Sequence, residues 1–144
     1  MIAIEINTAI KDFFSDEGSP YAGIDITPLF AYNDSSGPFI VYYEFPGTQS
    51  EEQFFLRVSN VIYYVYDNDI DRASQIARKL DEFLNVGDEV EYIKSRILAP
   101  YYYGYLNYRL TTSRLVSGSM MPPPEREGFS VISRNYRMVY VNVD

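Results

Sequence analysis

The feature that most constrains this fold is a strand-forming segment that leads, after a short polar break, into an amphipathic helix. Residues 55–66 are rich in β-branched and aromatic side chains and become apolar on both faces, which favours a central strand with a helix on one side. Asp67, Asn68 and Asp69 supply helix N-cap candidates. The helix is expected to stop near residues 85–87. Its apolar stripe steps by three or four positions: Ile70, Ala73, Ala77, Leu80 and Leu84.

Further strands and two further helices are predicted around this unit. Residues 2–14 carry apolar side chains at helical spacing and predict a first helix. Residues 39–45, FIVYYEF, predict a strand that a Pro-Gly turn closes. The long connection between them, 19–38, is expected to contain at most a short extended piece around 24–30. Residues 90–97 predict a short additional helix.

Two segments near the end of the chain predict a strand pair, 101–116 and 129–143. With no internal repeat, the 144 residues fit a single α+β domain spanning 1–144. We expect a mainly antiparallel sheet with helices packed on one face and a long hairpin with an exposed loop. The absence of a long apolar run predicts no membrane span.

The loop between the last two strands reads SGSMMPPPEREG, residues 117–128. Three consecutive prolines exclude a helix and the interior of a sheet, so the segment predicts an exposed, mobile hairpin tip. The chain also holds 15 tyrosines and nine phenylalanines, and tyrosine is enriched at protein interfaces. The interface candidates are therefore Met120, Met121, Pro122, Pro123, Pro124, Tyr101, Tyr102, Tyr103 and Tyr105.

The composition offers few of the residue types that enzymes use for catalysis. The chain contains no cysteine and no histidine, which removes thiolate nucleophiles, the commonest general base and the commonest metal ligands. DNDID at residues 67–71 resembles the start of a calcium loop, but Arg72 and Arg78 stand where that loop needs glycine and glutamate, so a helix cap is the better interpretation. We expect no enzyme activity, no cofactor and no metal; a carboxylate-based enzyme remains the last alternative.

Charge is distributed unevenly along the chain, whose net charge is −8. Up to Pro100 there are seven Lys and Arg against seventeen Asp and Glu, and after it five against three. This argues against a general nucleic-acid binder. A single-stranded nucleic-acid module is nevertheless an alternative, because arginines alternate with aromatic residues as on single-strand-binding surfaces. That set is Arg109, Arg114, Arg134 and Arg137 with Tyr105, Tyr108, Tyr136 and Tyr140.

The run from Phe39 to Leu84 resembles the tail terminator and tail completion (neck) proteins of long-tailed bacteriophages. The resemblance lies in a strand pair that leads directly into a helix with an aspartate, an alanine four residues later and spaced apolar positions, here Asp69, Ala73, Ala77, Leu80 and Leu84. An amphipathic N-terminal helix precedes them. The last third of the chain matches in outline only, as strands around a loop.

The resemblance implies a structural virion protein with no catalytic residues. Such a subunit forms a homo-oligomeric ring, usually a hexamer, between the tail tube protein and the head connector proteins, and double-stranded DNA passes through its lumen without specific binding. The expected location is the virion neck, with the host cytoplasm during assembly. Acidic side chains suit a lumen that repels the DNA backbone, and Glu51 and Glu52 are the candidates. A head-closure or adaptor connector is an alternative.

Overall fold

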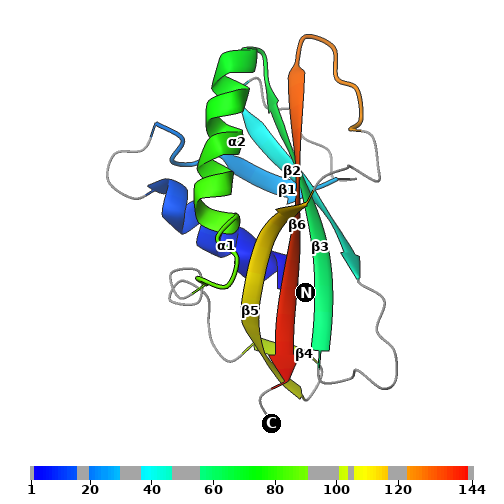
Figure 1. Ribbon diagram of the computed structural model, residues 1–144. Coiled ribbons are helices and arrows are strands. Elements are labelled where there is room, and N and C mark those ends of the chain that lie inside the picture. Colours follow the sequence, from blue (N-terminus) through cyan, green and yellow to red (C-terminus); the bar gives the residue numbers. More distant parts are fainter. Residues whose placement is uncertain are drawn as a thin grey trace.

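A computed structural model describes residues 2–15, 20–29, 37–46, 56–90, 101–103, 106–116 and 123–142. Within them, six strands form one twisted sheet with the order β1-β2-β3-β6-β5-β4, and two helices lie against it (Figure 1). The elements are α1 Ile2–Ser15, β1 Asp25–Pro28, β2 Phe39–Pro46, β3 Leu56–Asp67, α2 Ile70–Leu84, β4 Tyr101–Tyr103, β5 Leu106–Val116 and β6 Ser130–Asn142.

Strand pairing is antiparallel throughout the described sheet except between β1 and β2, which run parallel. β3 and β6 form the longest ladder, from Leu56 opposite Val141 to Asp67 opposite Ser130. β3 is central, with β2 on its other side, as its two-sided apolar pattern predicts. The predicted α+β class with a mainly antiparallel sheet is confirmed.

Helix α2 begins and ends where the sequence signals predict. Asp69 is the N-cap, and its side chain accepts a hydrogen bond from the backbone N–H of Asp71. Asn85 is the C-cap, and Gly87 follows with φ +64°, a conformation that glycine adopts without steric cost. Ile70 is a correction: it was predicted in the buried stripe but is 50% exposed, because it is the first residue of the helix and burial begins three residues later, at Ala73.

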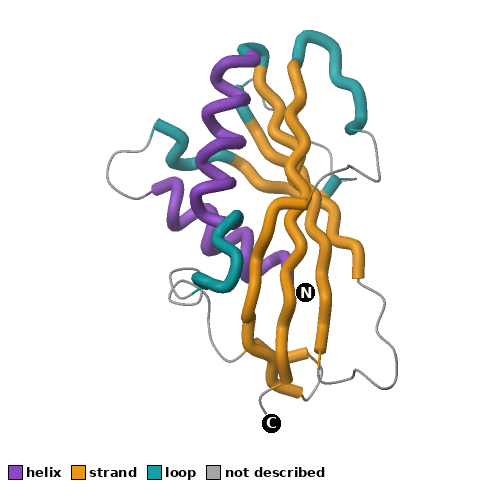
Figure 2. The backbone as a smooth tube through the Cα atoms, viewed as in Figure 1, coloured by secondary structure: helices purple, strands orange, loops and turns teal. Residues whose placement is uncertain are grey.

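The main core lies between the helices and one face of the sheet (Figure 2). Its members alternate along the strands and recur along the helices, because each element buries a single face here. A buried polar contact joins α1 to the sheet: the Tyr63 hydroxyl donates to the Asn7 Oδ1 at 2.8 Å. The core includes Ile6, Ile10, Phe14, Ile40, Val61, Tyr63, Val65, Ile76, Leu80, Leu84, Leu110, Tyr136, Met138 and Tyr140.

The predicted strand over 101–116 is wrong in one respect, since it forms two strands. β4 and β5 pair antiparallel, with Tyr103 opposite Leu106, so the chain doubles back. The strand pair β5 and β6 is confirmed, with a register shift between Leu110 and Thr112. Val90 is buried, but the rest of the predicted 90–97 helix lies outside the described residues.

The residues after α2 pair with the outer edge of β5. Gly87 and Ser113 exchange two backbone hydrogen bonds of 2.8 Å, and the Ser113 hydroxyl donates to the Leu84 carbonyl at 2.6 Å. The side chain of Asn85 accepts from the Leu115 N–H at 3.1 Å. This part of β5 is therefore already bonded on both sides. Neither described helix has the length and apolar character needed to cross a membrane.

Candidate functional site

The face of the sheet away from the helices carries a second apolar cluster. β2 and β3 contribute its buried members, Phe39, Val41, Ile62, Tyr64 and Tyr66. Phe39 lies opposite Tyr66 in the strand register, and their rings stack with centroids 4.9 Å apart and planes 5° from parallel. Such a cross-strand aromatic pair makes a flat, rigid surface.

Residues 123–129, here called the strap, lie against this second cluster. In Figure 1 the strap leads up to the start of β6, on the side away from α2. The Tyr66 hydroxyl donates a 2.6 Å hydrogen bond to the Pro124 carbonyl. A turn that ends at Gly128, with φ +82°, brings the chain from the strap into β6, and the Phe129 N–H donates to the Arg126 carbonyl at 3.1 Å.

Arg126 lies between two aromatic rings. Its guanidinium carbon is 4.7 Å from the ring centroid of Phe39 and 4.9 Å from that of Phe129. The two rings meet edge to face, with centroids 5.6 Å apart. A planar guanidinium suits this position because it stacks on aromatic faces and is weakly hydrated.

Burial raises the pKa of Tyr66 to about 12, and the neighbouring Tyr64 adds to this, while the Arg126 cation lowers it in part. The hydroxyl is thus protonated, and able to donate to Pro124, over the whole neutral range. Beside the strap lies an open cavity of about 610 Å³. Its walls are Pro123, Pro124, Glu125, Arg126, Glu127, Phe129 and Val131.

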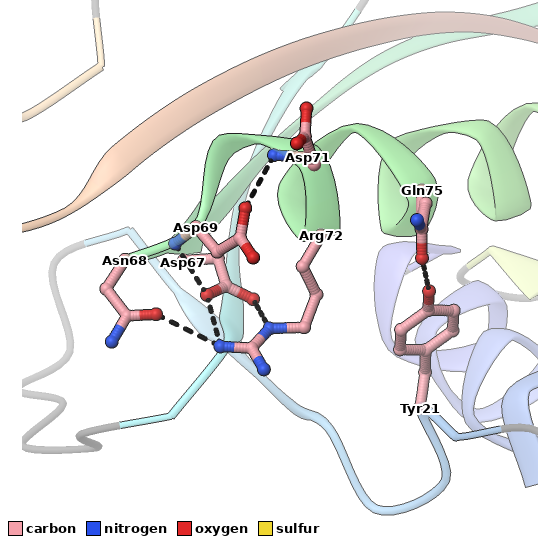
Figure 3. Close-up of polar contacts among 7 residues, drawn as sticks. All are labelled: Tyr21, Asp67, Asn68, Asp69, Asp71, Arg72 and Gln75. Carbon is pink, nitrogen blue, oxygen red and sulfur yellow. Dashed lines mark hydrogen bonds and ion pairs between the residues drawn. The ribbon is translucent and has the colours of Figure 1, made fainter.

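The acidic DNDID segment forms a structural cap at the start of α2 (Figure 3). Asp67 is fully buried and accepts from the Arg72 Nε at 2.6 Å and from the Asp69 N–H at 3.0 Å. Burial alone would raise the pKa of Asp67, but the hydrogen bonds from Arg72 and the backbone outweigh it and lower the pKa. The helix-cap interpretation is confirmed. Among the described residues, no group of three or more acidic side chains is placed to hold a metal ion.

A second carboxylate joins α2 to β6. Asp81 accepts a 2.6 Å hydrogen bond from the Tyr136 hydroxyl and a 3.3 Å ion-pair contact from the Arg134 Nε. Burial and the bond to Asp81 raise the pKa of Tyr136 far above its usual range. The arrangement fixes the helix on the sheet and leaves this tyrosine without an acid–base role near neutral pH.

The structure describes part of the predicted interface. Pro123 is partly buried and Pro124 exposed, both in the strap, and residues 101–103 form the edge strand β4. Within the predicted tip, Glu125 and Glu127 are exposed, whereas Arg126 is partly buried, so the described part of the tip is attached to the sheet. Predicted residues outside the described ranges are Met120, Met121, Pro122, Tyr105, Glu51 and Glu52.

The alternating arginines and tyrosines do not form one surface. Tyr136 and Tyr140 are buried in the helix-side core and are not available to stack on bases. Arg114 and Arg137 are exposed and lie opposite each other in the register of β5 and β6, and Arg134 binds Asp81.

The sequence prediction did not single out Phe39, Tyr66, Arg126 or Phe129 as one site. A signal existed: Phe39 and Tyr66 belong to strands that are apolar on both faces, and the second face needs a cover. The partner segment is far along the chain, and no local pattern connects it to these strands.

These observations define an α+β domain with a two-faced sheet, helices on one face and a proline-containing strap on an aromatic cluster on the other. A scan of the chain against protein-family models finds no match, and a search of curated proteins finds none either.

Proposed function

We propose that this chain is a structural subunit of a homo-oligomeric ring, a hexamer, at the neck of a long-tailed bacteriophage. The ring joins the tail tube protein to the head connector proteins and lets double-stranded DNA pass through its lumen without specific binding. The proposal gives the chain no catalytic role and no cofactor.

The β2–β3–α2 unit is the observation that supports this proposal most. An antiparallel strand pair leads through a capped turn directly into an amphipathic helix, preceded by the N-terminal helix α1. This is the order in which the resemblance to tail terminator and tail completion proteins places those elements. Asp69 caps the helix, and Ala73, Ala77, Leu80 and Leu84 are buried against the sheet.

Two further observations are compatible with a ring subunit. The strap and the aromatic cluster that it covers make the second face of the sheet a rigid surface, at whose margin the partly buried Phe129 and Val131 offer apolar contact to another subunit. The net charge of −8 suits a ring around DNA, because like charges keep the DNA backbone from adhering to the lumen.

The test is to image the purified chain by negative-stain electron microscopy over a range of concentrations, with native mass spectrometry of the same samples. Six-fold rings with a central hole are expected. Twelve-fold rings would replace the terminator role with that of a head-side adaptor. Monomers at every concentration, combined with tight binding of a labelled single-stranded oligonucleotide, would overturn the proposal in favour of a nucleic-acid module.

A matched pair of variants links the ring to the strap. Arg126→Ala removes the cation that contacts Phe39 and Phe129, whereas Arg78→Ala removes an exposed arginine on the outer side of α2. If the second face takes part in assembly, the first variant forms fewer rings than the wild type and the second forms as many. If both variants form as many rings as the wild type, the contacts of Arg126 in the strap are not needed for assembly.

A further inference from the structure

We infer that the part of the second face around Arg114 and Arg137 is a docking surface for another protein, which presents carboxylates flanked by apolar side chains. This inference concerns the surface of the chain itself and goes beyond the proposed ring function. It holds whether or not the chain forms rings.

The two arginines belong to one row that crosses neighbouring strands. In the strand register, Arg137 on β6 lies opposite Arg114 on β5 and opposite Asn60 on β3. Side chains alternate between the faces of a strand, and Val131, six residues before Arg137, packs against the second cluster. Arg137 therefore lies on the second face, further along β6 from the strap, and the residues opposite it share that face.

This part of the second face is open. β6 is an interior strand, with β3 and β5 on either side, and yet Arg137 is exposed, as is Arg114. The next row on the same face is partly buried and mainly apolar, with Val139 opposite Thr112 on β5 and Val58 on β3. The surface thus carries two adjacent cations with valines beside them. It is called here the arginine face and consists of Val58, Thr112, Arg114, Arg137 and Val139.

Neither arginine of this face forms an ion pair with a described residue. The salt bridges within the described ranges use Arg72 and Arg134 instead. The Arg114 guanidinium lies over Gly87, where an added Cβ would be 3.7 Å from it, and the exposed Asp88 beside Gly87 makes no salt bridge with it. Like charges directly opposite each other on neighbouring strands are destabilising. An anion bound at the pair would relieve this repulsion.

Charge and surface chemistry favour the carboxylates of a protein over the phosphates of a nucleic acid. A guanidinium binds a carboxylate through two parallel hydrogen bonds, and arginine is enriched at protein interfaces. Single-stranded nucleic acids are bound by a longer track of cations with aromatic stacking surfaces, whereas valines flank this pair. The net charge of −8 repels an extended polyanion. At physiological salt this repulsion is screened beyond about 8 Å, so it acts weakly on a single carboxylate.

The docking surface is tested with the blocked peptide acetyl-Leu-Glu-Glu-Leu-amide, titrated into the ¹⁵N-labelled chain at a concentration at which native mass spectrometry shows monomers. The matched control, acetyl-Leu-Gln-Gln-Leu-amide, has the same size and apolar side chains but no charge. The glutamate peptide should shift the amide resonances of Arg137 and Val139, with a Kd on the order of 1 mM. The glutamine peptide should bind at least about threefold more weakly.

Variants of the chain locate the contact. Arg114→Gln and Arg137→Gln each remove one cation, and each should weaken binding of the glutamate peptide about threefold. In the double variant the two peptides should bind equally, because the carboxylates then have no arginine partner to lose. Arg78→Gln removes an exposed arginine on the outer side of α2 and should bind both peptides as the wild type does.

Three results of this titration would overturn the inference. The first is the absence of shifts on the arginine face at tens of millimolar glutamate peptide. The second is equal binding of the two peptides by the wild type. The third is tighter binding of octathymidylate than of the glutamate peptide, lost in the double variant, which would reassign the two arginines to the phosphates of a nucleic acid.

Urea denaturation of the free variants distinguishes docking from a structural role. Arg114→Gln and Arg137→Gln should be at least as stable as the wild type, because each removes a contact between like charges. If either unfolds at a clearly lower urea concentration, the arginines stabilise the fold and the docking role is wrong. Failure of these tests leaves the proposed function standing, and failure to find rings leaves the docking surface standing, because the peptide is titrated into monomers.

Discussion

The hydroxyl of Tyr66 donates a 2.6 Å hydrogen bond to the carbonyl of Pro124, 58 residues later in the chain. This bond joins the end of the central strand β3 to the strap on the second face of the sheet. A proline carbonyl is the polar backbone group still available in a segment that lacks N–H donors. The bond is therefore a directional link between strap and sheet.

Replacing Tyr66 with phenylalanine should weaken this link while keeping the stacked ring. We expect Tyr66→Phe to lower the free energy of unfolding by about 1 kcal/mol, the net value of one intramolecular hydrogen bond. Amide exchange at Arg126 and Phe129 should accelerate. Urea denaturation and hydrogen-exchange mass spectrometry measure the two effects.

The control is Tyr21→Phe, which removes a tyrosine hydroxyl bonded to Gln75 at 2.6 Å on the helix side of the molecule (Figure 3). It should leave exchange in the strap unchanged. Equal exchange rates in the strap for the wild type and Tyr66→Phe would show that the hydroxyl does not hold the strap.

Alkaline pH should release the strap. Folding raises the pKa of Tyr66 from 10.0 to about 12, so the folded state favours the protonated hydroxyl. The resulting stabilisation is fully present below pH 10 and is lost as the pH rises through 12. The rate of amide hydrogen exchange in the strap, corrected for the intrinsic rate, should rise in this pH window in the wild type. Tyr66→Phe should show no such step, and a step of equal size in that variant would assign the transition to another group.

Asp67 should contribute more to stability than its acidic neighbours. Asp67→Asn removes the charge of a buried carboxylate that binds Arg72 and the Asp69 amide, and should cost about 2 kcal/mol at neutral pH. Asp71→Asn, at an exposed position, should change stability by less than about 0.5 kcal/mol. Chemical denaturation of both variants gives these values.

The Asp67 effect should also depend on pH in a defined direction. Because the pKa of Asp67 is lowered from 3.8 in the folded state, its stabilisation is present above that value and is lost as the pH falls below it. The stability difference between the wild type and Asp67→Asn should therefore shrink in acid. A difference that stays constant down to pH 2 would contradict the ion-pair account.

Gly87→Ala should strain the connection that covers the edge of β5. Its φ of +64° disfavours alanine, so we expect the free energy of unfolding to fall by about 1 kcal/mol. Space is not the cause, because the nearest side-chain atom to a new Cβ would lie at an ordinary 3.7 Å. Gly23→Ala, at φ +83° with open space around it, should lose a similar amount. Thermal melting with light scattering compares them. Aggregation during heating should increase in the first variant alone, since only Gly87 of this pair bonds to β5.

Local patterns predicted the elements well. The stripe of α2, its Asp69 cap and its end near Gly87 follow from side-chain spacing and capping chemistry, which act within a few residues. β1 matched the short extended piece expected near 24–30, but its parallel pairing with β2 carries no local signal. Ile70 was misplaced because periodicity predicts which face of a helix is buried and does not show at which residue along the helix the burial begins.

The candidate site was much harder to predict. Three consecutive prolines indicate a segment outside regular structure, and this favoured an exposed tip for residues 117–128. The same chemistry leaves a carbonyl for Tyr66, and Arg126 completes the contact through two rings, Phe39 on β2 and Phe129 just before β6. These interactions join segments that are far apart in the sequence, and no local sequence pattern predicts which distant segments meet in the fold.

The backbone bonds between Gly87 and Ser113 have a consequence for how copies of this chain can join. A sheet grows into a fibre when a new strand adds to a free edge, and the loop after α2 occupies that position on β5. On the opposite side, β1 is four residues long and ends in proline, which cannot donate to an incoming strand. At these two positions open-ended polymer growth is discouraged, which favours association through the broad faces, where geometry can close a particle of fixed size.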